Sequence, residues 1–179
     1  LDTKNRVVAE AGQYAHTSGT GFRPNAPVNV YIFSTPILLG ILMTDENGNF
    51  QLTGAVGNIV AIGGVDISTN LPHTTVLRAP AGSTIVSPLT TLISAVADTG
   101  VSIAQAQAKV LESLNLPSTV NLTSFDPIQA AASLTATSTD KAAAVAVYKA
   151  AAMVANVLTQ TAAAVSTASS SIKSTEVAA

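Results

Sequence analysis

Short apolar stretches separated by turn-forming residues occupy the first half of the chain. In residues 28–33 polar and apolar side chains alternate, which places every second side chain on the same face of a β-strand. Asn47 and Gly48 supply the positive φ angles that a tight hairpin turn needs. Further strand candidates are residues 6–14, 37–43, 59–62, 74–77 and 84–86. The pattern predicts several short antiparallel strands that pack as a small sandwich.

Helix signals begin directly after this region. Ser87 has the side chain of an N-cap, and Pro88 fits the first helical turn, where its missing N–H costs nothing. Leu89 and Leu92 follow as apolar positions, and Gly100 ends the segment. We therefore expect Pro88, Leu89 and Leu92 to fix the junction between the two halves of the chain.

More helices are predicted further along the chain. Ser102 and Gln105 form a capping box at the start of one helix. Asp126 is followed by a proline, as Ser87 is, and this predicts another N-cap and the start of another helix. The longest helix is expected to start at Thr139 and to reach about residue 169.

One face of this longest helix is apolar. Its members recur at spacings of three and four residues, and they are Val147, Ala151, Val154, Leu158, Ala162 and Val165. A monomer of this size has too little interior to bury a helix on all sides, and large exposed apolar surfaces mark interaction sites. We therefore expect copies of the chain to associate along a seam formed by Val147, Val154, Leu158 and Val165. The helix could instead cover the β half or enter a membrane.

A membrane span is the less favoured of these alternatives. The best candidate, residues 142–158, is interrupted by Lys149 and Asn156 and is rich in alanine rather than leucine. A charge near the centre of a span costs ~3 kcal/mol on insertion scales. No transmembrane span is therefore expected.

The two halves of the chain differ in their content of turn-forming residues. All 11 glycines lie at or before Gly100 and all 8 prolines lie at or before Pro127, whereas alanine concentrates towards the C-terminus. We expect a β-sandwich region in residues 1–86 and a helical region in residues 87–179. The predicted fold class is α+β: a small immunoglobulin-like antiparallel β-sandwich followed by a helical bundle with a long Ala-rich C-terminal helix.

Composition narrows the class of function. Charged residues make up 10% of the chain, against about 25% in ordinary soluble proteins. A net charge of −2 leaves no basic surface for nucleic acid, and 47% hydrophobic residues argue against disorder. Cysteine is absent, which removes disulfides and thiolate chemistry. A chain rich in Ala, Ser and Thr and without cysteine is typical of exported bacterial proteins, so an extracellular or cell-surface location is expected.

Two ordered sets of short motifs resemble modules of bacterial surface proteins. The first set resembles immunoglobulin-like modules of large surface proteins, and its motifs are residues 18–28, 33–36, 39–40 and 44–50. The second resembles a module repeated in long adhesins, and its motifs are residues 63–69, 77–84, 86–93, 125–127 and 155–160. In that module a β part leads through a Ser-Pro-Leu-Thr-Thr-Leu segment into a helical part. The resemblance implies an extracellular structural or adhesive role without catalysis.

Calcium is a point at which the chain departs from these repeats. Related repeats often carry a calcium loop of the Asp-x-Asn-x-Asn-Gly type, whereas residues 28–42 contain no acid. Asp45 and Glu46 offer oxygen ligands nearby, but the twelfth position of such a loop is Val56 and not a bidentate glutamate. A hairpin turn is therefore favoured over a metal site here.

No residue set predicts catalysis. His16 and His73 are the two histidines, and neither lies in a nucleophile or metal motif. The glycine clusters lack the Lys-Ser/Thr that a phosphate-binding loop needs. We therefore expect no enzyme activity, no catalytic residues, no cofactor, no metal and no small-molecule substrate.

The function predicted from the sequence is that of a non-enzymatic structural protein of the bacterial cell surface. It would assemble with copies of itself, or with neighbouring modules, into a fibre, layer or stalk. The alternative is a ligand-binding adhesin module that recognises a glycan or protein. Its contacts would come from loops of the β half, at Tyr14, His16, Phe22 and Arg23.

Overall fold

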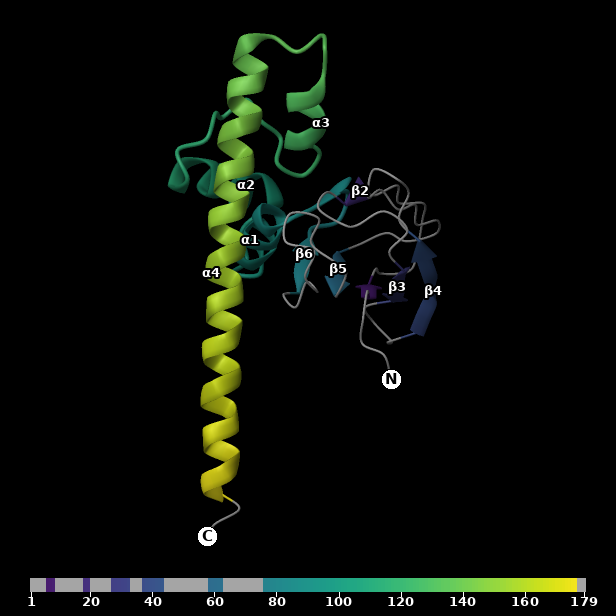
Figure 1. The fold of residues 1–179 in the computed structure, drawn as a ribbon, viewed down its shortest axis with the longest axis vertical. Coiled ribbons are helices and arrows are strands. Elements are labelled where there is room, and N and C mark those ends of the chain that lie inside the picture. The colour runs from purple at the N-terminus through teal and green to yellow at the C-terminus, as the bar shows by residue number, and fades with distance from the viewer. Residues whose placement is uncertain are drawn as a thin grey trace.

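The computed structural model describes residues 6–8, 18–19, 27–32, 37–43, 58–62 and 76–176. In this part of the chain all strands precede all helices (Figure 1). The strands are β1 (Arg6–Val8), β2 (Ser18–Gly19), β3 (Pro27–Ile32), β4 (Ile37–Met43), β5 (Ile59–Ile62), β6 (Leu77–Ala79) and β7 (Ile85–Val86). The helices are α1 (Pro88–Ala97), α2 (Ile103–Ser113), α3 (Pro127–Ala132) and α4 (Ser138–Glu176).

The described strands form one five-stranded sheet and one two-stranded sheet. The larger sheet has the order β4-β3-β1-β5-β6, and the smaller one pairs β2 with β7. Strand β1 is central: Val7 lies opposite Val30 of β3 in a parallel pair and opposite Ala61 of β5 in an antiparallel pair. The five-stranded sheet is therefore mixed, and its two edges are β4 and β6.

This arrangement contradicts the predicted fold class. An immunoglobulin-like sandwich consists of two antiparallel sheets packed face to face, and no such pair of sheets exists among the described strands. The β1–β3 and β2–β7 pairs are parallel instead. The error has a physical cause, because apolar alternation reports which face of a strand is buried and says nothing about which strand lies beside it.

The helix starts follow the local signals in the sequence. Ser87 accepts a hydrogen bond from the Thr90 N–H at the start of α1, and Ser102 does the same for Gln105 at the start of α2. Asp126 caps α3 through the N–H groups of Ile128 and Gln129. The predicted long C-terminal helix is present and runs seven residues beyond its expected end, to Glu176. Caps are visible in the sequence because they depend on residues only a few positions apart.

Two threonine hydroxyls join α1 to the sheet. The Thr90 hydroxyl lies 2.8 Å from the carbonyl oxygen of Arg78 and accepts a hydrogen bond of 2.8 Å from the Ser87 N–H. The Thr91 hydroxyl accepts a bond of 2.8 Å from the Arg78 N–H. The N–H and the carbonyl of Arg78 in edge strand β6 are therefore both hydrogen-bonded to side chains of α1. Helix α1 thus takes the place that a further strand would occupy at this edge.

Helix α1 lies between the sheet and α4. It packs against β6 and β7 on one side and against α2 and α4 on the other (Figure 1). The buried side chains that gather around it on the helical side are Leu89, Ile93, Ala106, Val110, Leu111, Val120, Leu122, Val147, Ala150 and Val154. This core positions α4 and determines how much of α4 is covered.

Candidate functional site

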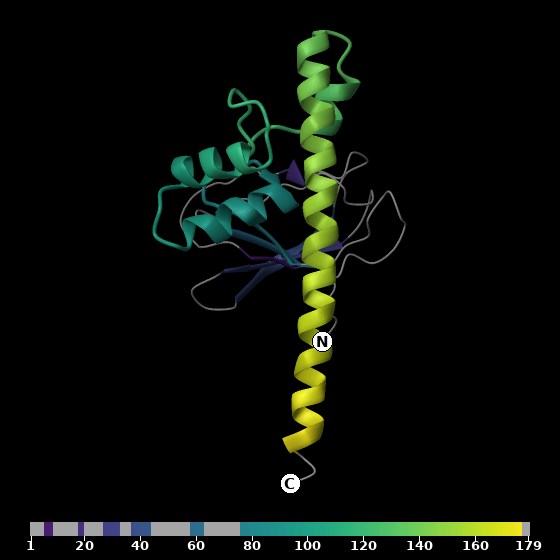
Figure 2. The same cartoon turned by 90° about the vertical axis from the view of Figure 1, so that its left-hand side faces the viewer.

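Helix α4 continues well past the core that holds its first half. Val147, Ala150 and Val154 are 2%, 2% and 8% exposed, and no residue between Val154 and position 165 is buried. We call residues 155–176 the α4 extension. At 1.5 Å per residue it is about 33 Å long, and it projects beyond α1, α2 and the strands (Figures 1 and 2).

The apolar face of α4 does not stop where the core stops. Val147, Ala151, Val154 and Leu158 lie in or against the core at alternating spacings of four and three, and Thr161 and Val165 continue this spacing, with the predicted Ala162 one position away from it. Ala168 and Ile172 continue the same spacing in the sequence. A seven-residue repeat of this kind is the pattern of helices that pack along each other. The chain's own core thus covers the repeat at Val147 and Val154, whereas Thr161 and Val165 are exposed.

The α4 extension is uncharged up to residue 172, and several of its side chains before residue 166 are exposed. From residue 150 to residue 172 the sequence contains no Asp, Glu, Lys or Arg. Val157 and Val165 are 61% and 60% exposed, and Leu158 is half-buried. A solvated single helix usually carries a charged face, often with ion pairs four residues apart. Residues 155–172 carry no charged side chain, although Lys173 and Glu176 follow them, and an uncharged exposed surface of this kind is typical of interaction sites.

Length and composition alone would also let α4 cross a membrane. Residues Ser138–Val165 form an apolar stretch with a mean hydropathy of 1.5. However, Ala144, Val147 and Val154 in this stretch are buried against the rest of the chain. The core helices of water-soluble proteins meet the same criterion, so the stretch gives only weak evidence for a membrane span.

The residues proposed for the seam fall into three groups. Val147 and Val154 lie in the chain's own core, Leu158 lies at its margin, and Val165 is exposed. The sequence could not separate these groups, because the boundary depends on where α1 packs along α4. Self-association through the seam stays a prediction, and of the four seam residues only Leu158 and Val165 are open to a partner.

The junction residues occupy the first turns of α1. Pro88 is at the start of the helix, Leu89 is 1% exposed in the core, and Leu92 is half-buried against the same core. Sequence reasoning missed Thr90 and Thr91, which bind the backbone of β6. The role of Thr90 could have been predicted from its position three residues after Ser87, because its hydroxyl there completes a capping box. Asn47 and Gly48 lie outside the described residues.

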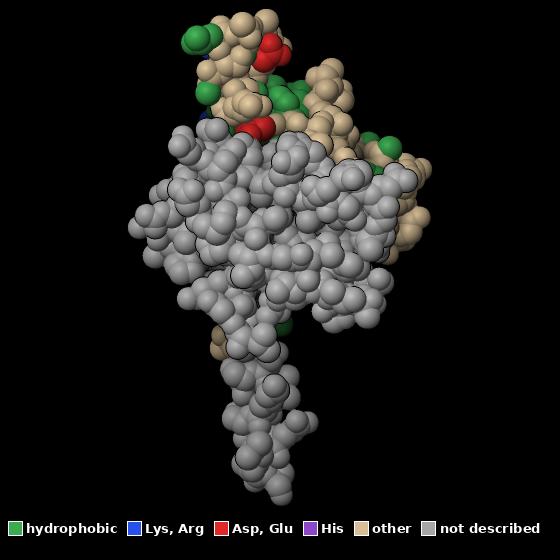
Figure 3. Space-filling model, turned by 90° about the vertical axis from the view of Figure 1, so that its right-hand side faces the viewer, with side chains coloured by type: hydrophobic (Ala, Val, Ile, Leu, Met, Phe, Trp, Pro, Cys, Tyr) green, Lys and Arg blue, Asp and Glu red, His purple; other side chains and the backbone are tan. Residues whose placement is uncertain are grey.

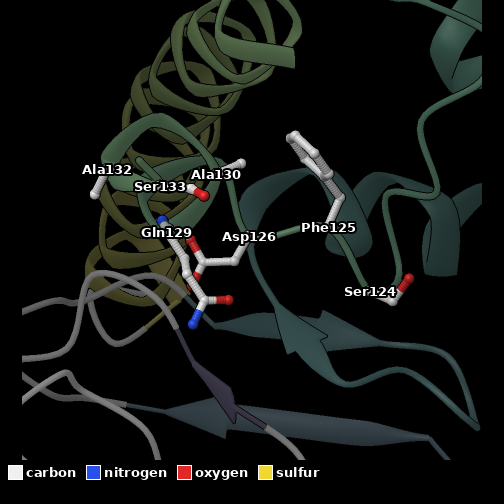
Figure 4. Close-up of a pocket in the computed structure, with 7 residues that line it drawn as sticks. All are labelled: Ser124, Phe125, Asp126, Gln129, Ala130, Ala132 and Ser133. Atoms are coloured by element: carbon white, nitrogen blue, oxygen red, sulfur yellow. Dashed lines mark hydrogen bonds between the residues drawn. The ribbon is translucent and has the colours of Figure 1, made fainter. Parts of the chain in front are cut away.

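Two shallow hollows flank Phe125 where α3 meets α4. One, of about 670 Å³, is lined by the loop before α3 and by α3 itself (Figure 4), and the other, of about 600 Å³, lies between residues 115–125 and the start of α4. Figure 3 shows this end of the molecule, where hydrophobic and acidic side chains lie among polar ones. The carboxylates beside the hollows already serve helix ends: Asp126 caps α3, and Asp140 binds Thr137. Asp126 accepts its two bonds through Oδ1 and Asp140 accepts its two bonds through Oδ2, so both acids beside the hollows are held at helix ends.

Metal and catalytic candidates are not brought together by the described residues. Within these ranges no group of three or more His, Cys, Asp or Glu side chains could hold a metal ion. His16, His73, Asp45 and Glu46 lie outside the described residues, as do Tyr14, Phe22 and Arg23 of the alternative binding surface. Comparisons with protein-family models, with curated proteins and with solved structures each gave no match to the chain.

The start of α4 is sensitive to pH through Asp140. Hydrogen bonds from the Thr137 hydroxyl and N–H lower the pKa of this carboxyl from its ordinary value of 3.8. The carboxylate therefore stabilises the fold above pH 3.8, and this contribution is lost as the pH falls through the lowered pKa. We expect Asp140→Asn to lower the thermal midpoint near neutral pH and to lose that effect in strong acid. A difference between variant and parent that does not change with pH in circular dichroism melts would contradict this.

Proposed function

We propose that this protein is a non-enzymatic structural protein of the bacterial cell surface that associates with copies of itself through the α4 extension. The observation that carries the proposal is the uncharged apolar face that leaves the core at Val154 and continues along an exposed helix. Soluble proteins seldom leave such a face in contact with water, because burying it elsewhere is favourable. We propose an exported location because the chain has no cysteine and few charged residues.

The size of the contact suits repeated assembly better than one tight pair. Burying an aliphatic side chain contributes about 1.5–3 kcal/mol, and the α4 extension offers few such groups, chiefly Val157, Leu158 and Val165. Association also costs roughly 4–15 kcal/mol in lost translational and rotational freedom. A single pair of helices is therefore expected to bind weakly. Many linked copies, as in a fibre, layer or stalk, would gain strength from multiplicity.

The proposal predicts that a charge on the seam dissociates the assembly. Val165→Asp places a carboxylate on the apolar face, and burying it without a partner costs at least about 2 kcal/mol. Since 1.4 kcal/mol is a factor of ten, we expect association to weaken by at least about 30-fold. The measurement is sedimentation velocity of the full chain over a wide concentration range.

The matched control is Ala163→Asp. Ala163 is exposed and lies two residues before Val165, about 160° away around the helix, so its charge should leave association unchanged. A parent protein that stays a monomer at every concentration would refute the proposed function. Equal weakening by both variants would show that net charge, and not the seam, controls association.

A further inference from the structure

We draw no further inference here: the strongest candidate, the apolar stripe that α4 leaves open at Leu158 and Val165, belongs to the surface already described, and nothing in the described part of the structure shows what covers it.

Discussion

Replacing Ile93 with alanine is expected to lower the free energy of unfolding by about 2–5 kcal/mol. Ile93 is 0% exposed and belongs to the cluster in which α1 meets α2 and α4. Truncation removes its transfer free energy and leaves a cavity that rigid helices cannot fully close. Urea unfolding followed by circular dichroism measures the change, with the midpoint shifting and the slope unaltered.

The matched control removes an apolar side chain that nothing covers. Leu134, in the loop between α3 and α4, is 98% exposed, so Leu134→Ala should change stability by no more than about 0.5 kcal/mol. If Ile93→Ala cost as little as Leu134→Ala, the core around α1 would not be what holds the helices together.

Thr90→Val is expected to destabilise the chain by about 1–3 kcal/mol although it hardly changes the shape of the side chain. The hydroxyl lies 2.8 Å from the Arg78 carbonyl and accepts the Ser87 N–H, and Thr90 is 0% exposed. Valine would leave the Ser87 N–H without its acceptor and would remove the hydroxyl that donates to the Arg78 carbonyl of strand β6. An unmet donor in a buried place costs its desolvation. Chemical denaturation gives the size of the loss.

The same substitution at an exposed threonine separates the hydrogen bonds from the change of residue type. Thr119 is exposed in the loop after α2, and Thr119→Val should lie within about 0.5 kcal/mol of the parent. A Thr90→Val variant as stable as Thr119→Val would mean that the bonds between α1 and β6 contribute nothing to stability.

The sequence predicted the helices better than the sheet. Ser87, Ser102 and Asp126 mark helix starts through contacts within three residues, and such contacts are readable in a single chain. The pairing of β1 with β3 joins residues more than twenty positions apart, and its parallel direction leaves no local mark. The immunoglobulin-like expectation failed for this reason.

The sequence predicted that the long helix has an apolar face, but it did not predict how much of that face is exposed. The spacing of Val147, Val154, Leu158 and Val165 identified one apolar face of the long helix. The chain's own core covers only part of that face. The covered part depends on where α1 packs along α4, which is decided by tertiary packing. The sequence therefore indicated a seam and could not say where the seam becomes available to a partner.

The placement of α1 between the sheet and α4 has a mechanical consequence. A force that pulls on the far end of α4 along its axis reaches the sheet through α1, first across the side chains shared with Val147 and Val154 and then across the bonds from Thr90 and Thr91 to Arg78. The contact between α4 and α1 is loaded in shear, so that many side chains resist the force together. The contact between α1 and β6 is held by hydrogen bonds. Tension delivered along α4 would thus be transmitted through α1 to strand β6.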